Sequence, residues 1–151
     1  MTVEWFMKSS SADLGMVLET TERALYSPGA FYAAANEYAG YQMTRTHNLV
    51  KDWSATDGRW HHYALVHDWD SMTADIVRLY RDGVQVETHL SANTSAARLR
   101  AGRLFIGTRN GWEYPFVGQL DDIKITGRAL APAEFMKKRS RPAYGVTVIL
   151  R

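Results

Sequence analysis

Short stretches in which apolar and polar residues alternate, separated by turn-forming pairs, recur along most of this 151-residue chain. Successive side chains of a β-strand point to opposite faces, so this alternation predicts strands with one face turned to a core. Clear turn signals are Pro28-Gly29, Asp57-Gly58 and Asp82-Gly83. Strands do not alternate with long helical patterns, which argues against a parallel α/β sheet. The pattern predicts an all-β fold, an antiparallel two-sheet β-sandwich.

The positions of the individual elements follow from the same pattern. The segment 60–67 is apolar on both faces, which predicts a central strand covered on both sides. Pro132 suits the first turn of a short helix near the C-terminus, because its missing N–H has no partner to lose there. Strands are expected at residues 3–8, 16–19, 30–35, 38–44, 60–67, 76–81, 84–88, 103–107, 116–126 and 144–150, and the helix at 132–138.

The pair Asp82-Gly83 predicts a β-hairpin between the strands 76–81 and 84–88. Both central residues of a type I′ turn need positive φ, which this pair tolerates. Alternation then assigns side chains to faces on both hairpin strands and on the long strand 116–126. The residues expected to face the core are Val77, Leu79, Val84, Val86, Ile123 and Ile125.

Composition narrows the class of protein. The chain is 46% hydrophobic and 23% charged, its length fits one domain over residues 1–151, and it has no cysteine for disulfides or thiolate metal sites. The net charge is +2 without a basic stripe, so nucleic acid is not an expected partner. No apolar run is long enough to span a membrane, and no signal peptide is expected at the N-terminus.

Three segments, in order and spacing, resemble the laminin-G-like branch of the concanavalin A-like lectin/glucanase superfamily. Trp60, His62 and Ala64 match that family's Trp-x-His-x-Ala strand, residues 77–84 its hairpin, and residues 116–134 its Gly-x-Ile-Asp-Asp strand with the helix that follows. Residues 3–8 also resemble an early family strand. The resemblance covers nearly the whole chain and implies a jelly-roll sandwich.

The resemblance implies a non-catalytic recognition module for carbohydrate or glycoprotein, within a larger exported or surface protein. The alternatives are a protein-interaction, adhesion or structural domain, and a glucanase-like glycoside hydrolase. Family members usually carry a further N-terminal strand. Either this chain is an excised segment, or its C-terminal strand covers that edge of the sheet. An uncovered edge would favour a homodimer through strand pairing.

The carboxylates give little support for catalysis. Glycoside hydrolases need two carboxyl groups that converge on one bond. Asp121 and Asp122 alternate faces in an extended strand and cannot form such a pair. The sequence therefore predicts no catalytic residue and no organic cofactor.

Three aspartates form the one candidate metal site. Asp68 and Asp70 point the same way in an extended segment, Asp75 is near in sequence, and oxygen ligands of this kind suit Ca²⁺. Laminin-G-like domains often bind calcium at the sandwich rim; the alternative is a solvated loop. His61 and His62 face opposite sides of their strand and cannot share a metal. The resemblance implies that His62 is a hydrogen-bonded core group.

The candidate ligand-binding residues lie in one loop between two strands. They are Arg109, Asn110, Trp112, Glu113 and Tyr114. Sugars are recognised by an aromatic platform under their C–H face, together with polar groups for their hydroxyls, and this loop supplies both. The alternative is that Trp112 folds back on the sheet. An exposed Trp112 would favour sugar binding.

Overall fold

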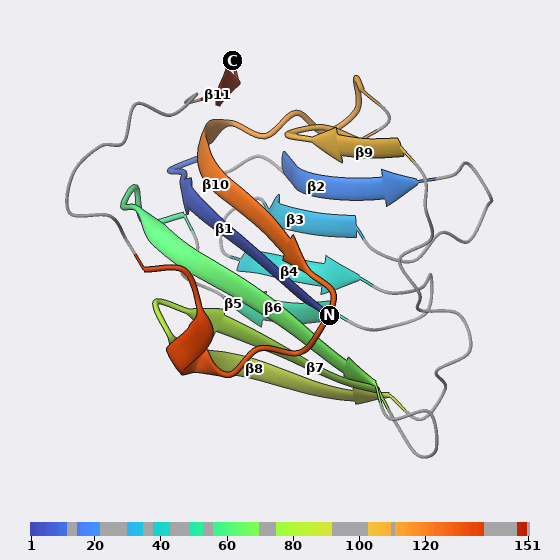
Figure 1. Cartoon of the computed structure of the whole chain (residues 1–151). Coiled ribbons are helices and arrows are strands. Elements are labelled where there is room, and N and C mark those ends of the chain that lie inside the picture. The colour runs from blue at the N-terminus through green and yellow to red at the C-terminus, as the bar shows by residue number, and fades with distance from the viewer. Residues whose placement is uncertain are drawn as a thin grey trace.

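Two antiparallel β-sheets packed face to face form the described part of the protein (Figure 1). The computed structural model describes residues 1–11, 15–21, 30–34, 38–42, 49–52, 56–69, 75–91, 103–109, 111–137 and 148–150. The first sheet has the order β11-β10-β1-β6-β7-β8, and the second has the order β5-β4-β3-β2-β9. Every strand pairing is antiparallel, which confirms the predicted fold class.

The bounds of the strands stay close to those expected from alternation. They are β1 (Thr2–Lys8), β2 (Gly15–Thr21), β3 (Ala30–Ala34), β4 (Tyr38–Gln42), β5 (Leu49–Asp52), β6 (His61–Trp69), β7 (Asp75–Arg81), β8 (Val84–Ser91), β9 (Arg103–Ile106), β10 (Gly118–Thr126) and β11 (Val148–Leu150). The four-residue strand β5 was not expected, because it is too short to show alternation.

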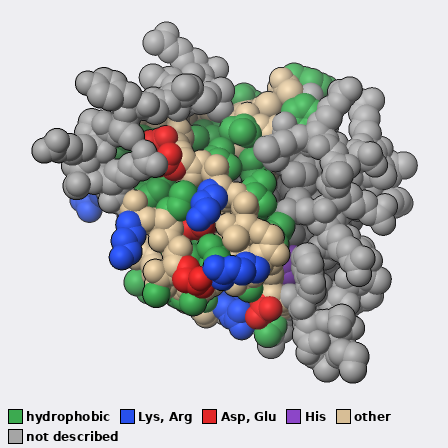
Figure 2. All heavy atoms as spheres, in the orientation of Figure 1, with side chains coloured by type: hydrophobic (Ala, Val, Ile, Leu, Met, Phe, Trp, Pro, Cys, Tyr) green, Lys and Arg blue, Asp and Glu red, His purple; other side chains and the backbone are tan. Residues whose placement is uncertain are grey.

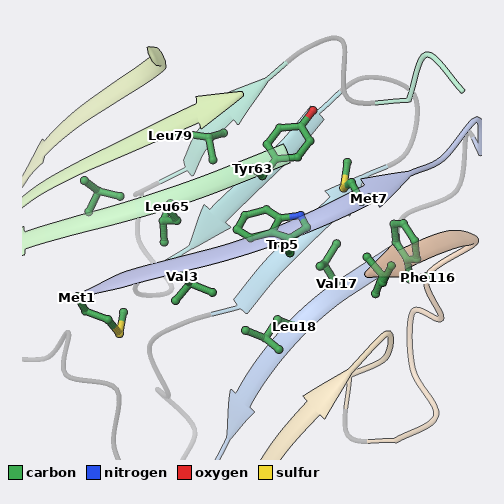
Figure 3. Packing of buried hydrophobic residues seen from close by; sticks show 12 residues of the cluster. Met1, Val3, Trp5, Met7, Val17, Leu18, Tyr63, Leu65, Leu79 and Phe116 are labelled. Carbon is green, nitrogen blue, oxygen red and sulfur yellow. The ribbon is translucent and has the colours of Figure 1, made fainter. Parts of the chain in front are cut away.

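The hydrophobic core lies between the two sheets (Figure 3). Val3, Trp5 and Met7 all point into it from β1, as their alternation predicted. The indole of Trp5 stacks on the ring of Tyr63 with centroids 5.5 Å apart. The buried members of this cluster are Met1, Val3, Trp5, Met7, Val17, Leu18, Tyr63, Leu65, Val77, Leu79, Phe116 and Leu120.

The hairpin confirms its predicted turn and corrects one side chain. Asp82 and Gly83 have φ angles of 51° and 81°, as a type I′ turn requires. Val77 and Leu79 are fully buried, but Val84, expected to face the core, is 67% exposed. The register shifts between Leu79 and Tyr80, and Val84 sits beside the turn on an edge strand, beyond the cover of the core.

Ile125 is a second wrong prediction of burial, while Ile123 packs against the core as expected. Ile125 pairs with Val3 and therefore lies on the core side of its sheet, yet 46% of it is exposed. β11 pairs only with Gly118–Leu120, so at Ile125 β10 is the outermost described strand. The pairing also shows that a C-terminal strand covers part of the β10 edge. Dimerisation through an edge strand stays a prediction.

The outer face of the first sheet is crossed by residues 128–137, here called the strap (Figure 1). The Thr2 hydroxyl donates to the Arg128 carbonyl and accepts from the Leu130 N–H, each at 2.9 Å. Leu130 and Phe135 then pack over Ala64, Val66 and Tyr80 in a second buried cluster. The side chains of β1 from Thr2 to Met7 and of β6 from His62 to His67 are therefore buried on both faces, which confirms the prediction for β6.

The helix expected at 132–138 is wrong in type and length. The strap contains one 3-10 turn, Pro132–Glu134, and Phe135 is extended with φ −63° and ψ 154°. The Phe135 ring packs edge-on against Tyr80 at 5.1 Å, and the Met136 N–H donates to the Glu4 carboxylate at 2.5 Å. These contacts with the sheet replace the intrahelical bonds that a longer helix would need.

Candidate functional site

The predicted ligand-binding loop is held by a dense set of backbone hydrogen bonds. Arg109 and Glu113 exchange N–H···O bonds of 2.7 and 2.9 Å, and the Thr108 hydroxyl donates to the Glu113 carbonyl at 3.0 Å. Met16 donates to the Tyr114 carbonyl at 2.8 Å, which fixes the loop to β2. Gly111 has φ +88°, where a residue with a Cβ would be strained. The loop is therefore a small closed hairpin on the sandwich.

The side chains of this hairpin are presented outward. Trp112 is 71% exposed, so the alternative in which it folds back on the sheet is not what the structure shows. Tyr114 is 43% exposed, and the Arg109 guanidinium lies over its ring at 5.2 Å, a cation–π contact. Asn110 lies outside the described residues. An exposed indole can stack on an apolar ring face, and the same loop carries the guanidinium of Arg109 and the carboxylate of Glu113 as hydrogen-bonding groups.

The structure describes only part of the predicted calcium site. The Asp68 carboxylate lies 3.6 Å from the Arg78 guanidinium, so one candidate ligand has a cationic neighbour. The backbone of Asp75 pairs with Trp69, but its side chain and all of Asp70 lie outside the described residues. Among the described residues no group of three His, Asp or Glu side chains could hold a metal ion. The site stays a prediction.

Asp121 and Asp122 shape the backbone of their own strand. The Asp121 carboxylate accepts the Asp122 N–H at 2.9 Å, and Asp122 has φ +45° where β1 and β10 lose register. The extra residue at this irregularity turns the strand. This geometry fits the structural interpretation of the pair.

A buried polar cluster lies beneath the strap and was not predicted from the sequence. Glu4 is completely buried, with Oε1 3.3 Å from the His62 Nε2 and Oε2 3.7 Å from the Lys124 ammonium. His62 is buried, as expected of a core group, and its Nε2 faces Glu4 without a hydrogen bond of good geometry. Burial lowers the pKa of His62, although the Glu4 charge opposes the shift. The sequence feature that could have revealed this cluster is Glu4, the one acidic residue in the strand of residues 3–8.

His61, on the other face of β6, is held between two carboxylates. Its Nδ1 lies 2.5 Å from Asp82 and its Nε2 3.0 Å from Asp57. Burial alone would lower the pKa of His61, but its contacts with Asp82 and Asp57 outweigh this and raise it. Burial by itself would raise the pKa of Asp82. Its hydrogen bonds with His61 and with the His62 N–H outweigh burial and lower this pKa. The three groups fix the hairpin turn to the start of β6.

Comparison with known proteins agrees with this architecture. A family model described as the concanavalin A-like lectin/glucanases superfamily, of the laminin G type, matches residues 1–135. No curated protein sequence matches the chain at a significant level. The matched residues run from β1 to Phe135 in the strap, and domains of this kind are lectin-like or binding modules that are typically non-catalytic. Within the described ranges, no helix has the length and apolar character to cross a membrane.

Proposed function

The chain belongs to the concanavalin A-like lectin/glucanase superfamily, and on this basis we propose that it is a non-catalytic module that binds carbohydrate through the loop of residues 109–114. The exposed indole of Trp112 is the observation that carries the proposal. A hydrogen-bonded hairpin presents this large amphipathic ring to water, so little backbone ordering is left to oppose binding. We place the module within a larger exported or surface protein, as the family resemblance implies.

The polar groups of the loop match the hydroxyls of a sugar. Arg109 is held over Tyr114, and the loop also carries the carboxylate of Glu113, so donors and acceptors lie in the same short segment as the indole. Hydroxyl groups both donate and accept hydrogen bonds, and a sugar can therefore use both kinds of partner.

A protein partner is the second candidate. Val117, three residues beyond Tyr114, is also 43% exposed, so apolar side chains continue outward past the loop. Tryptophan, tyrosine and arginine are also enriched where proteins bind one another. This alternative predicts binding to a protein surface that glycosidase treatment of the partner leaves unchanged.

A glycan array with wild-type protein and the Trp112→Ala variant tests the proposal. Wild type should select a defined class of glycan, and Trp112→Ala should weaken that binding by about tenfold or more, as expected for a central aromatic contact. The exposed residue Val84 provides the control, because Val84→Ala removes a surface apolar side chain outside the loop. Retention of full glycan binding by Trp112→Ala would contradict the assignment of the loop.

A further inference from the structure

A cavity of about 430 Å³ lies on the outer face of the first sheet, between the strap and the Asp82-Gly83 turn. Its floor is formed by Phe6, His62 and Phe135, each more than nine-tenths buried. Trp60, Asp82 and Lys137 line it nearer the surface. None of its lining residues belongs to the loop 109–114, so the cavity is separate from the proposed sugar-binding loop.

The floor of the cavity is aromatic and its charges are paired within the protein. The His62 ring lies 4.8 Å from that of Phe6 and 6.0 Å from that of Phe135. Glu4 is buried behind His62, with the Lys124 ammonium 3.7 Å from its carboxylate. The His62 ring is tilted by 50° to Phe6 and by 47° to Phe135, so a ligand on this floor meets small apolar areas of three rings, with the Glu4–Lys124 pair behind them.

The upper part of the cavity offers one acceptor and one donor of opposite charge. The Asp82 carboxylate is fixed by the His62 N–H at 2.9 Å and by His61 at 2.5 Å, and its oxygens have lone pairs left to accept further bonds. The exposed ammonium of Lys137 lines the cavity from the strap. On the face that Figure 2 shows, acidic and basic side chains of the described residues are interspersed.

These features select the chemistry of the occupant. Asp82 offers only acceptors and Lys137 only donors, so a ligand of one charge would bind one of them and be repelled by the other. A wholly apolar ligand would strip water from Asp82 and Lys137 without replacing their hydrogen bonds, which is costly. A neutral ring with an apolar C–H face and several hydroxyls can contact the aromatic floor and hydrogen-bond both Asp82 and Lys137. The volume of the cavity is in the range of small-molecule pockets.

We propose that this cavity is a second carbohydrate-binding site, which takes one neutral sugar residue on the Phe6–His62–Phe135 floor. Trp60 covers the ring, Asp82 accepts from one hydroxyl and Lys137 donates to another. The choice of a sugar rests in part on the proposed function, since both sites would then serve one ligand class. The module would hold a glycan at two separate positions.

Saturation-transfer NMR and calorimetry with glucose, galactose, mannose and N-acetylglucosamine test the proposal. We expect wild type to bind at least one of these sugars at two sites per chain. Trp112→Ala should leave one site, and Lys137→Ala should weaken that remaining site by about tenfold, a typical loss for a well-placed contact. Lys137 is exposed, so its removal leaves the fold intact, and Lys8→Ala is the matched control for charge.

The outcomes separate the two proposals. If Trp60→Ala and Lys137→Ala weaken binding and Trp112→Ala does not, the result supports the cavity and overturns the loop assignment. Binding that Trp112→Ala alone abolishes would overturn the cavity proposal and leave the loop assignment in place. Failure of wild type to bind any of the four sugars would overturn the cavity as a site for a single neutral sugar, while the array on larger glycans still tests the loop.

Discussion

Thr2 should control whether the strap stays on the sheet, and Thr2→Val is the sharpest test of that role. The buried hydroxyl of Thr2 serves two backbone groups of the strap, the Leu130 N–H and the Arg128 carbonyl. Valine has nearly the shape of threonine, so packing beside Val66, the cross-strand partner of residue 2, is retained. The substitution removes the two hydrogen bonds and little else.

The expected cost follows from the burial of those two groups. An unsatisfied buried donor or acceptor costs about 1–3 kcal/mol. The bond to Leu130 is buried and that to Arg128 only partly, so water can reach the second group more easily. We expect Thr2→Val to lower the free energy of unfolding by about 2–3 kcal/mol. Thr2→Ser keeps the hydroxyl and loses one methyl group, which should cost about 1 kcal/mol.

Urea denaturation of both variants, with hydrogen exchange at the Leu130 amide, provides the measurement. The midpoint should fall further for Thr2→Val than for Thr2→Ser at an unchanged slope, because a changed slope would signal a different unfolded state. The Leu130 amide should lose protection only in Thr2→Val. Equal stability of the two variants, with that amide still protected, would refute the assignment of Thr2 as the anchor of the strap.

Two further predictions concern pH and calcium. The raised pKa of His61 stabilises the fold fully below about pH 6.5, its ordinary pKa, and this contribution is lost as pH rises through the raised value. His62, with its lowered pKa, acts in the opposite direction. The contribution of His61 is therefore isolated by comparing the melting temperatures of wild type and His61→Gln from acid to alkaline pH. Parallel curves would contradict a stabilising role of the His61 charge. If Asp68, Asp70 and Asp75 hold calcium, millimolar Ca²⁺ should raise the melting temperature and a chelator reverse the rise, because a ligand bound only to the folded state stabilises it. Asp68→Asn should abolish that rise, and no shift in wild type would remove the metal proposal.

Sequence alternation predicted the faces of strands better than the depth of burial. Val3, Trp5 and Met7 follow the period of two into the core because that period is a local property of the backbone. Ile125 obeys the same rule yet is half exposed, because its cover depends on where the neighbouring strand ends. Val84 was misplaced by a register shift that no local pattern reveals.

The strap and the candidate site depend on contacts that the local sequence does not encode. The segment 132–138 has a reasonable helix start, but Phe135 is extended, and it and Met136 are held by partners on β1, β6 and β7. The exposure of Trp112 could not be predicted, because tryptophan is as suitable for a core as for a platform. The loop residues were chosen because turn-rich segments between strands often carry function, and their role in binding stays a proposal.

Because β1 lies between β10 and β6, the first sheet cannot form until both of these strands have been synthesised. Glu4 is bonded to a residue 132 positions later in the chain, and Thr2 to one 128 positions later. A ribosome making this protein from its N-terminus therefore releases an apolar segment long before the neighbours that shield it, β10 and the strap, have been synthesised. Contacts of such long sequence separation slow folding, and the nascent chain would benefit from a chaperone until they form.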